Sequence, residues 1–211
     1  MLISAEGAAV LLIDIQERLV PALDNGGKEM VANAARLGAA AALFDVPVCA
    51  TEQAPEKLGP TVAEVAPYPQ LVLSKTTFNA AGYPTLLPPG TEDVLVAGCE
   101  AHVCVLQTVL GLLAARHRVL VVTDAIGSRT AANREAALDR LARHGAELVT
   151  TEMVLFEWLR DARHPRFREV HKLLRLRNHS ATVGPWIRDL ARSRWWAAVS
   201  TWPSWRVSKA P

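Results

Sequence analysis

The clearest structural signal in this sequence lies at residues 93–108, which read DVLVAGCEAHVCVLQT. The apolar run at 93–98 predicts a buried strand, and the apolar residues of 102–116 recur at helical spacing. Cys99 and Cys104 therefore fall where a strand passes into a helix. Because the chain has only three cysteines, we ask whether one of this pair is a packed thiol and the other a nucleophile.

Short apolar runs alternate with longer helical patterns along most of the chain. The predicted strands are 8–14, 46–52, 71–74, 93–98, 118–125 and 146–151, and the predicted helices are 27–44, 102–116, 130–144 and 152–160. Nearly continuous apolar strands are typical of sheets covered by helices on both faces, and strand–helix alternation indicates right-handed crossovers. We therefore predict an α/β fold with three αβα layers around a six-stranded, mostly parallel, Rossmann-like sheet.

Composition limits the class of protein. A chain of 211 residues, half of them hydrophobic, suits one domain with a sizeable core. No apolar run reaches the ~18 residues that span a bilayer, and the first run ends in Asp14 without a basic stretch before it, which predicts a strand and not a signal peptide. An odd cysteine count without a CxxC pair argues against a disulfide framework. We expect a cytoplasmic protein that does not bind membranes.

The C-terminal segment differs from the rest of the chain. Residues 175–211 hold seven Lys or Arg, one acidic residue and five of the six tryptophans, whereas the preceding residues hold 16 basic and 20 acidic side chains. The overall charge is thus no sign of nucleic-acid binding by the main domain. A Trp- and Arg-rich segment could contact a membrane surface or a partner. We expect a domain at 1–174 and a basic, poorly ordered extension at 175–211.

Three reactive side chains follow predicted strands. Asp14 ends the first, Lys75 follows the third and Cys104 comes after the fourth; in parallel sheets these ends share one edge, where ligands bind. Individually, they could be a helix cap, a solvated amine and a packed thiol. Together they indicate nucleophilic catalysis, with Lys75 and the helix N-terminus lowering the pKa of the Cys104 thiol and Asp14 taking its proton.

Six motifs carry a resemblance to a known family. They are LLIDIQERL (11–19), TEQAPEKLG (51–59), SKTTFNA (74–80), GCEAHVCVLQT (98–108), VTDAIGSR (122–129) and TTEMVLFEWL (150–159). In this order they resemble the isochorismatase-like cysteine hydrolase superfamily, which includes nicotinamidases and N-carbamoylsarcosine amidohydrolases. The likeness is closest to small isochorismatase-domain hydrolases and covers roughly residues 7–174.

The resemblance implies roles for particular residues. It implies an Asp14–Lys75–Cys104 triad and a cis peptide bond between Cys99 and Glu100, which would turn the Glu100 N–H toward the same point as the Cys104 N–H. Two such donors would form an oxyanion hole. In this interpretation Cys99 is a buried strand residue and Cys49 a strand-core thiol. The resemblance also implies a homo-oligomer, a dimer or larger.

Other candidate residues keep two interpretations each. Glu52 and Gln53 could bind substrate or serve a turn, Phe78 could line the pocket or the core, and His102 could line the pocket or, as we favour, cap its helix. Nicotinamidases carry an Asp-x-His metal cluster after the second strand, whereas TEQAPEKLG contains no histidine. We therefore predict no metal ion and no cofactor.

The function predicted from these residues is hydrolysis of a small amide or ureide at its C–N bond. Cys104 would form a thioester, Asp14 would act as base and Lys75 would stabilise charge. A non-catalytic oligomeric scaffold with the same fold is the alternative. A nucleotide-binding oxidoreductase is disfavoured because the first strand is followed by DIQERL and not by GxGxxG.

Overall fold

Six parallel strands in the order β3-β2-β1-β4-β5-β6 form the centre of the structure, a computed structural model that describes residues 1–175. The strands are β1 (Ala8–Ile13), β2 (Val48–Gln53), β3 (Leu71–Lys75), β4 (Asp93–Cys99), β5 (Arg118–Gly127) and β6 (Glu147–Val149). The predicted α/β class is confirmed, and the strands run wholly parallel in the described part. Strand order reverses at β1 and β4, which is where such sheets bind ligands.

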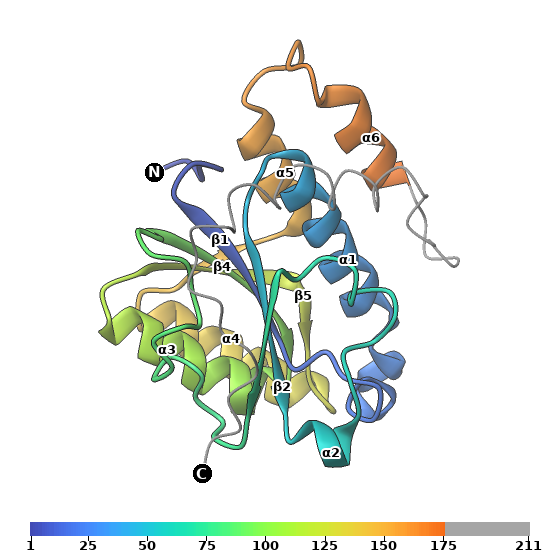
Figure 1. The fold of residues 1–211 in the computed structure, drawn as a ribbon, viewed down its shortest axis with the longest axis vertical. Coiled ribbons are helices and arrows are strands. Elements are labelled where there is room, and N and C mark those ends of the chain that lie inside the picture. Colours follow the sequence, from blue (N-terminus) through green and yellow to red (C-terminus); the bar gives the residue numbers. More distant parts are fainter. Residues whose placement is uncertain (176–211) are drawn as a thin grey trace.

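Helices cover both faces of the sheet (Figure 1). They are α1 (Lys28–Leu43), α2 (Pro55–Leu58), α3 (Leu106–Ala114), α4 (Ala131–Arg143), α5 (Thr151–Leu159) and α6 (Phe167–Arg175), with 3-10 turns η1 (Val20–Ala22) and η2 (Asp24–Gly27) and a π-helical turn η3 (Ala101–Val105). Helices α1, α5 and α6 lie on one face, and α3 and α4 lie on the other. The predicted three layers are confirmed; α2 and α6 were not predicted.

Strand alternation divides the core into two halves. On β1, Val10 and Leu12 pack into the cluster beneath α1, whereas Leu11 and Ile13 pack into the cluster beneath α3 and α4. All six residues of β1 are buried. The strand therefore forms a rigid base for the residue that follows it, Asp14.

A close backbone approach joins β1 and β4 at the same end. Gly98 pairs with Ile13 and has a φ of +127°, and a Cβ at Gly98 would lie 2.1 Å from the Ile13 carbonyl oxygen. Only glycine fits this contact. The next residue on β1, Asp14, has a φ of 50° and turns the chain out of the sheet.

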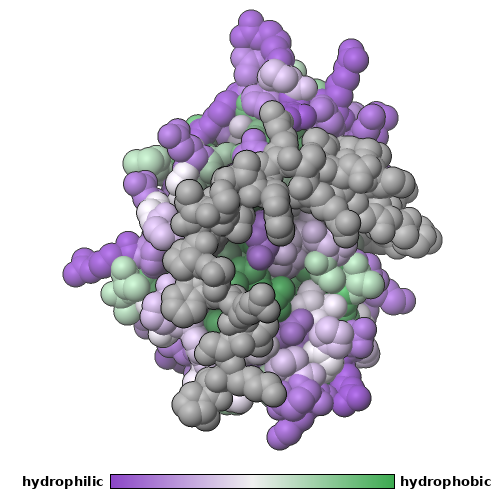
Figure 2. Space-filling model, in the orientation of Figure 1, coloured by the Kyte–Doolittle hydropathy of each residue, from purple (hydrophilic) through white to green (hydrophobic). Residues whose placement is uncertain are grey.

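The described surface carries few large apolar side chains. On the face in Figure 2, hydrophilic residues dominate the outline and hydrophobic residues gather near the middle. The exposed large apolar residues are Met1, Leu2, Val72, Phe78, Leu148, Met153 and Phe156. No helix within residues 1–175 has the length and apolar character needed to cross a membrane. The predicted C-terminal extension lies, from residue 176 on, outside the described residues.

Candidate active site

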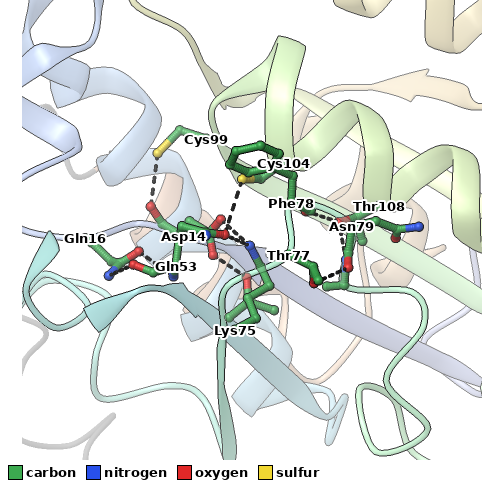
Figure 3. Close-up of polar contacts among 12 residues, drawn as sticks. Asp14, Gln16, Gln53, Lys75, Thr77, Phe78, Asn79, Cys99, Cys104 and Thr108 are labelled. Carbon is green, nitrogen blue, oxygen red and sulfur yellow. Dashed lines mark hydrogen bonds and ion pairs between the residues drawn. The ribbon is translucent and has the colours of Figure 1, made fainter. Parts of the chain in front are cut away.

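A buried ion pair occupies the carboxyl ends of β1 and β3 (Figure 3). Lys75 Nζ donates to Asp14 Oδ2 at 2.8 Å, and neither side chain is exposed to solvent. Only β2 separates β1 from β3, so the side chains of Asp14 and Lys75 can meet at the carboxyl ends of these strands. Breaking such a pair by removing one partner typically costs about 3–5 kcal/mol, so each charge needs the other.

The Asp14 carboxylate is fixed by a second donor. The hydroxyl of Thr51, a buried residue of β2, donates to Asp14 Oδ1 at 2.7 Å. The Asp14 main chain is held as well, because its carbonyl accepts from Gln16 N at 2.9 Å and from Cys99 Sγ at 3.1 Å. Thr51 was missed by the sequence prediction, although its register opposite Ile13, beside Asp14, is the signal that could have identified it.

Cys104 joins this pair through Gln53. Gln53 Oε1 accepts from Lys75 Nζ at 2.7 Å and lies 3.9 Å from Cys104 Sγ. Cys104 belongs to η3, between β4 and α3, and is 5% exposed. The structure thus brings the three predicted catalytic residues and Gln53 together, as Figure 3 shows.

The predicted lowering of the Cys104 pKa is wrong. Burial of the thiol, together with the charge and hydrogen bonding of Asp14, raises the pKa of Cys104 from 9.0 to about 12, and Lys75 opposes this only in part. The physical reason is that Lys75 already forms an ion pair with Asp14, so the thiol faces both charges of a compensated pair. These surroundings favour the protonated thiol of Cys104 over its thiolate.

The segment before Cys104 has an unusual backbone. The peptide bond between Cys99 and Glu100 is cis. Cys99 is fully buried, and this burial, followed by the charge of Asp14, raises the pKa of its thiol well above the ordinary value. The Glu100 carboxylate forms an ion pair with Arg129 at 2.8 Å. The cis bond and the two cysteines therefore lie directly beside the buried pair.

Within the described part of the chain, the side chains of the remaining candidates form no hydrogen bond or ion pair with Asp14, Lys75 or Cys104. Glu52 Oε1 accepts from Thr61 N at 2.7 Å and from Thr61 Oγ1 at 2.8 Å, so it supports a loop and is not brought to Lys75. His102 Nδ1 lies 3.1 Å from Ser128 Oγ. Phe78 is 49% exposed and so is not a core residue. Cys49 is a buried β2 residue whose burial raises its pKa to about 12.

Metal binding has no visible basis in the described part of the chain. Among residues 1–175, no three His, Cys, Asp or Glu side chains are grouped so that they could hold a metal ion. The groups that the structure gathers at the site are a thiol, a carboxylate, an ammonium group and the Gln53 carboxamide.

Comparison with known proteins identifies the family to which the chain belongs. The family model of the Isochorismatase domain matches residues 8–153. Isochorismatase domain-containing protein 2A of Mus musculus is 38% identical over 175 residues, covering 81% of this chain and 84% of that protein.

Two solved structures share the fold. One is MAR1 ribonuclease from Caenorhabditis elegans, with a TM-score of 0.77 and 30% identity over 88% of this chain and 98% of that one. The other is the YcaC gene product from Escherichia coli, named as an octameric hydrolase of unknown specificity, with a TM-score of 0.76 and 28% identity over 90% of this chain and 94% of that one. From the extent of the family match and the identity to its members, the chain belongs to the isochorismatase family.

Proposed function

We propose that this protein hydrolyses a small amide or ureide at its C–N bond, with Cys104 as nucleophile, Asp14 as base and Lys75 as charge stabiliser. The observation that carries the proposal is the contact chain in which Asp14, Lys75, Gln53 and Cys104 follow one another at 2.8, 2.7 and 3.9 Å. A thiol that shares one contact network with a proton acceptor and a cation is the arrangement expected of a nucleophilic centre.

In the first half of the reaction the same proton moves twice, first from Cys104 to Asp14 and then from Asp14 to the departing nitrogen. As Cys104 Sγ bonds to the substrate carbonyl carbon, its proton passes to the Asp14 carboxylate, and the carbonyl oxygen becomes an oxyanion. The backbone N–H groups of Glu100 and Cys104 are the proposed donors to that oxyanion, a type of interaction whose loss costs about 2.7–4 kcal/mol. The C–N bond then breaks, Asp14 returns the proton to the departing nitrogen, and a thioester remains on Cys104.

The second half restores the enzyme. Water attacks the thioester carbon and gives a proton to Asp14. The C–S bond then breaks, and Asp14 returns the proton to the sulfur. Lys75 keeps its ammonium charge throughout and stabilises whichever neighbour is negative. Because burial and the charge of Asp14 raise the pKa of the Cys104 thiol, the proposed attack is coupled to proton transfer to Asp14.

A substrate screen tests the proposal. Wild type and Cys104→Ala are incubated with a panel of small amides and ureides, and release of ammonia or amine is measured. An RNA oligonucleotide, whose cleavage is followed by gel electrophoresis, is added to the panel because a structural neighbour is named as a ribonuclease. We expect turnover of at least one amide or ureide and a loss of about 10⁴-fold or more in Cys104→Ala. Equal turnover by both proteins would refute the role of Cys104.

A non-catalytic scaffold is the second candidate, favoured by the 5% exposure and raised pKa of Cys104. We propose in either case that the chain forms a homo-oligomer, as the octameric relative from Escherichia coli does. Light scattering measures the oligomeric state. An oligomer with no turnover of any panel member would favour the scaffold.

A further inference from the structure

Gln16 is a buried polar residue that the proposed chemistry does not use. Its side chain is fully buried just beyond β1, two residues after Asp14. The Oε1 atom accepts from Gln53 N at 2.8 Å, and Nε2 donates to Gln53 O at 3.1 Å and to Gly59 O at 2.7 Å. Both ends of the carboxamide are therefore bonded to backbone (Figure 3).

This pairing continues the β1–β2 ladder with a side chain. The ladder ends where Ile13 pairs with Thr51 and Asp14 N donates to Thr51 O at 3.0 Å, because the left-handed φ of Asp14 turns the chain away. Beyond this point β1 offers no backbone partner for the Gln53 N–H and C=O. The Gln16 side-chain amide takes the place of the missing peptide group and pairs with both of them.

The residue held in this way contacts both reactive groups. The Gln53 side chain accepts from Lys75 through Oε1 and donates through Nε2 to Thr76 O at 2.7 Å, so its orientation is defined. An ammonium group has three donors. Asp14 and Gln53 take two of them, and Cys104 lies on the Gln53 side at 3.9 Å.

We propose that Gln16 is a positioning residue for the nucleophile, which acts by holding the Gln53 carboxamide against Lys75 and Cys104. The inference rests on the proposed role of Cys104. It predicts that loss of the Gln16 amide changes the reactivity of Cys104 only while Gln53 can still contact Lys75. A residue that merely stabilised the fold would have no such dependence.

A double-mutant cycle separates the two cases. Gln16→Met keeps the length of the side chain and removes its three hydrogen bonds, and Gln53→Met removes the carboxamide beside Lys75. Alkylation of Cys104 by iodoacetamide at about pH 8 is followed by mass spectrometry of the Cys104 peptide, with Cys104→Ala as blank. The matched control is Asn33→Leu, which removes another buried carboxamide, bonded to Asp124 O at 2.8 Å on β5.

We expect Gln16→Met to change the alkylation rate at least about fivefold in the wild-type background and less than about twofold in Gln53→Met. Asn33→Leu should lower the melting temperature without changing the rate. A change below about twofold in the wild-type background, or the same change in both backgrounds, would overturn the inference. If Gln16→Met does not fold, Gln16→Glu, which keeps the acceptor and loses the donor, takes its place in the cycle.

Alkylation needs no substrate, so the cycle reports on the position of the sulfur independently of catalysis. A coupled cycle without turnover in the substrate screen would retain the role of Gln16 and remove the proposed hydrolase. Turnover in the substrate screen with an uncoupled cycle would retain the proposed hydrolase and remove the role of Gln16.

Discussion

Replacing Asp14 with asparagine should speed alkylation of Cys104 while abolishing hydrolysis. Asp14 is the main charged group that raises the pKa of this thiol, and it is also the proposed proton acceptor. Asparagine has the same shape and keeps an oxygen for Lys75 or Thr51, but it carries no charge. The two readouts should therefore move in opposite directions. Because unfolding would also expose the buried Cys104 and speed its alkylation, the fold of the variant is verified separately.

The expected change in the alkylation rate follows from the pKa of the Cys104 thiol. A rise from 9.0 to about 12 lowers the thiolate fraction at about pH 8 by roughly a thousandfold. Higher intrinsic nucleophilicity of the more basic sulfur recovers part of this, so wild-type Cys104 should react about 40-fold more slowly than a free thiol. Removing the Asp14 charge should lower the pKa by about 1–2 units, and the net gain in alkylation rate is about three- to tenfold.

The assay follows iodoacetamide labelling of the Cys104 peptide from about pH 7 to 11, where the wild-type rate should rise roughly tenfold per pH unit without a plateau. Circular dichroism verifies the fold, because the variant leaves Lys75 buried without its carboxylate partner. The control is Asp139→Asn, which removes an exposed carboxylate that pairs with Arg143 and should not change the rate. Slower or unchanged labelling in Asp14→Asn would refute the reasoning.

Three further substitutions have distinct expected outcomes. Thr51→Val keeps the volume and removes the donor to Asp14 Oδ1, so kcat/KM should fall about 10- to 100-fold; unchanged kinetics would show that this hydrogen bond is dispensable. Glu52→Ala removes the acceptor for Thr61 and should lower the free energy of unfolding in urea by about 1–3 kcal/mol with kcat/KM retained; lost activity with retained stability would instead place Glu52 in catalysis. Gly98→Ala forces a Cβ against the β1 backbone and should lower the melting temperature through a loss of about 2 kcal/mol or more, whereas a stable variant would contradict the close approach.

The strands of this fold could be predicted because each contains a short apolar run, which is buried in the four central strands and partly exposed in the edge strands β3 and β6. Helix α2 could not be predicted, because Pro55–Leu58 is only four residues long and a segment of that length shows no helical periodicity. Helix α6, Phe167–Arg175, has apolar residues at helical spacing, of which Val170 and Leu173 are buried and Phe167 and Leu174 partly buried, so this spacing could have predicted the helix. Its position depends on packing against α1 and α5, which a local pattern does not contain.

The site was predictable where topology alone determines proximity. Asp14, Lys75 and Cys104 meet because parallel strands end at one edge of the sheet. Glu52 and Gln53 could not both face the site, because adjacent residues of a strand point to opposite faces; Thr51 and Gln53 share the face that does. The pKa of Cys104 was predicted with the wrong sign because burial and the commitment of Lys75 to Asp14 depend on three-dimensional contacts.

The ion pair beside Cys104 has a consequence for how readily this thiol is oxidised. Peroxides and other electrophiles react with thiolate far more readily than with thiol. A thiol that is 5% exposed and whose pKa is raised by burial and by Asp14 should react slowly with oxidants, and in the proposed mechanism it loses its proton to Asp14 only as a carbonyl substrate is attacked. The arrangement proposed for catalysis should therefore also slow the oxidation of Cys104.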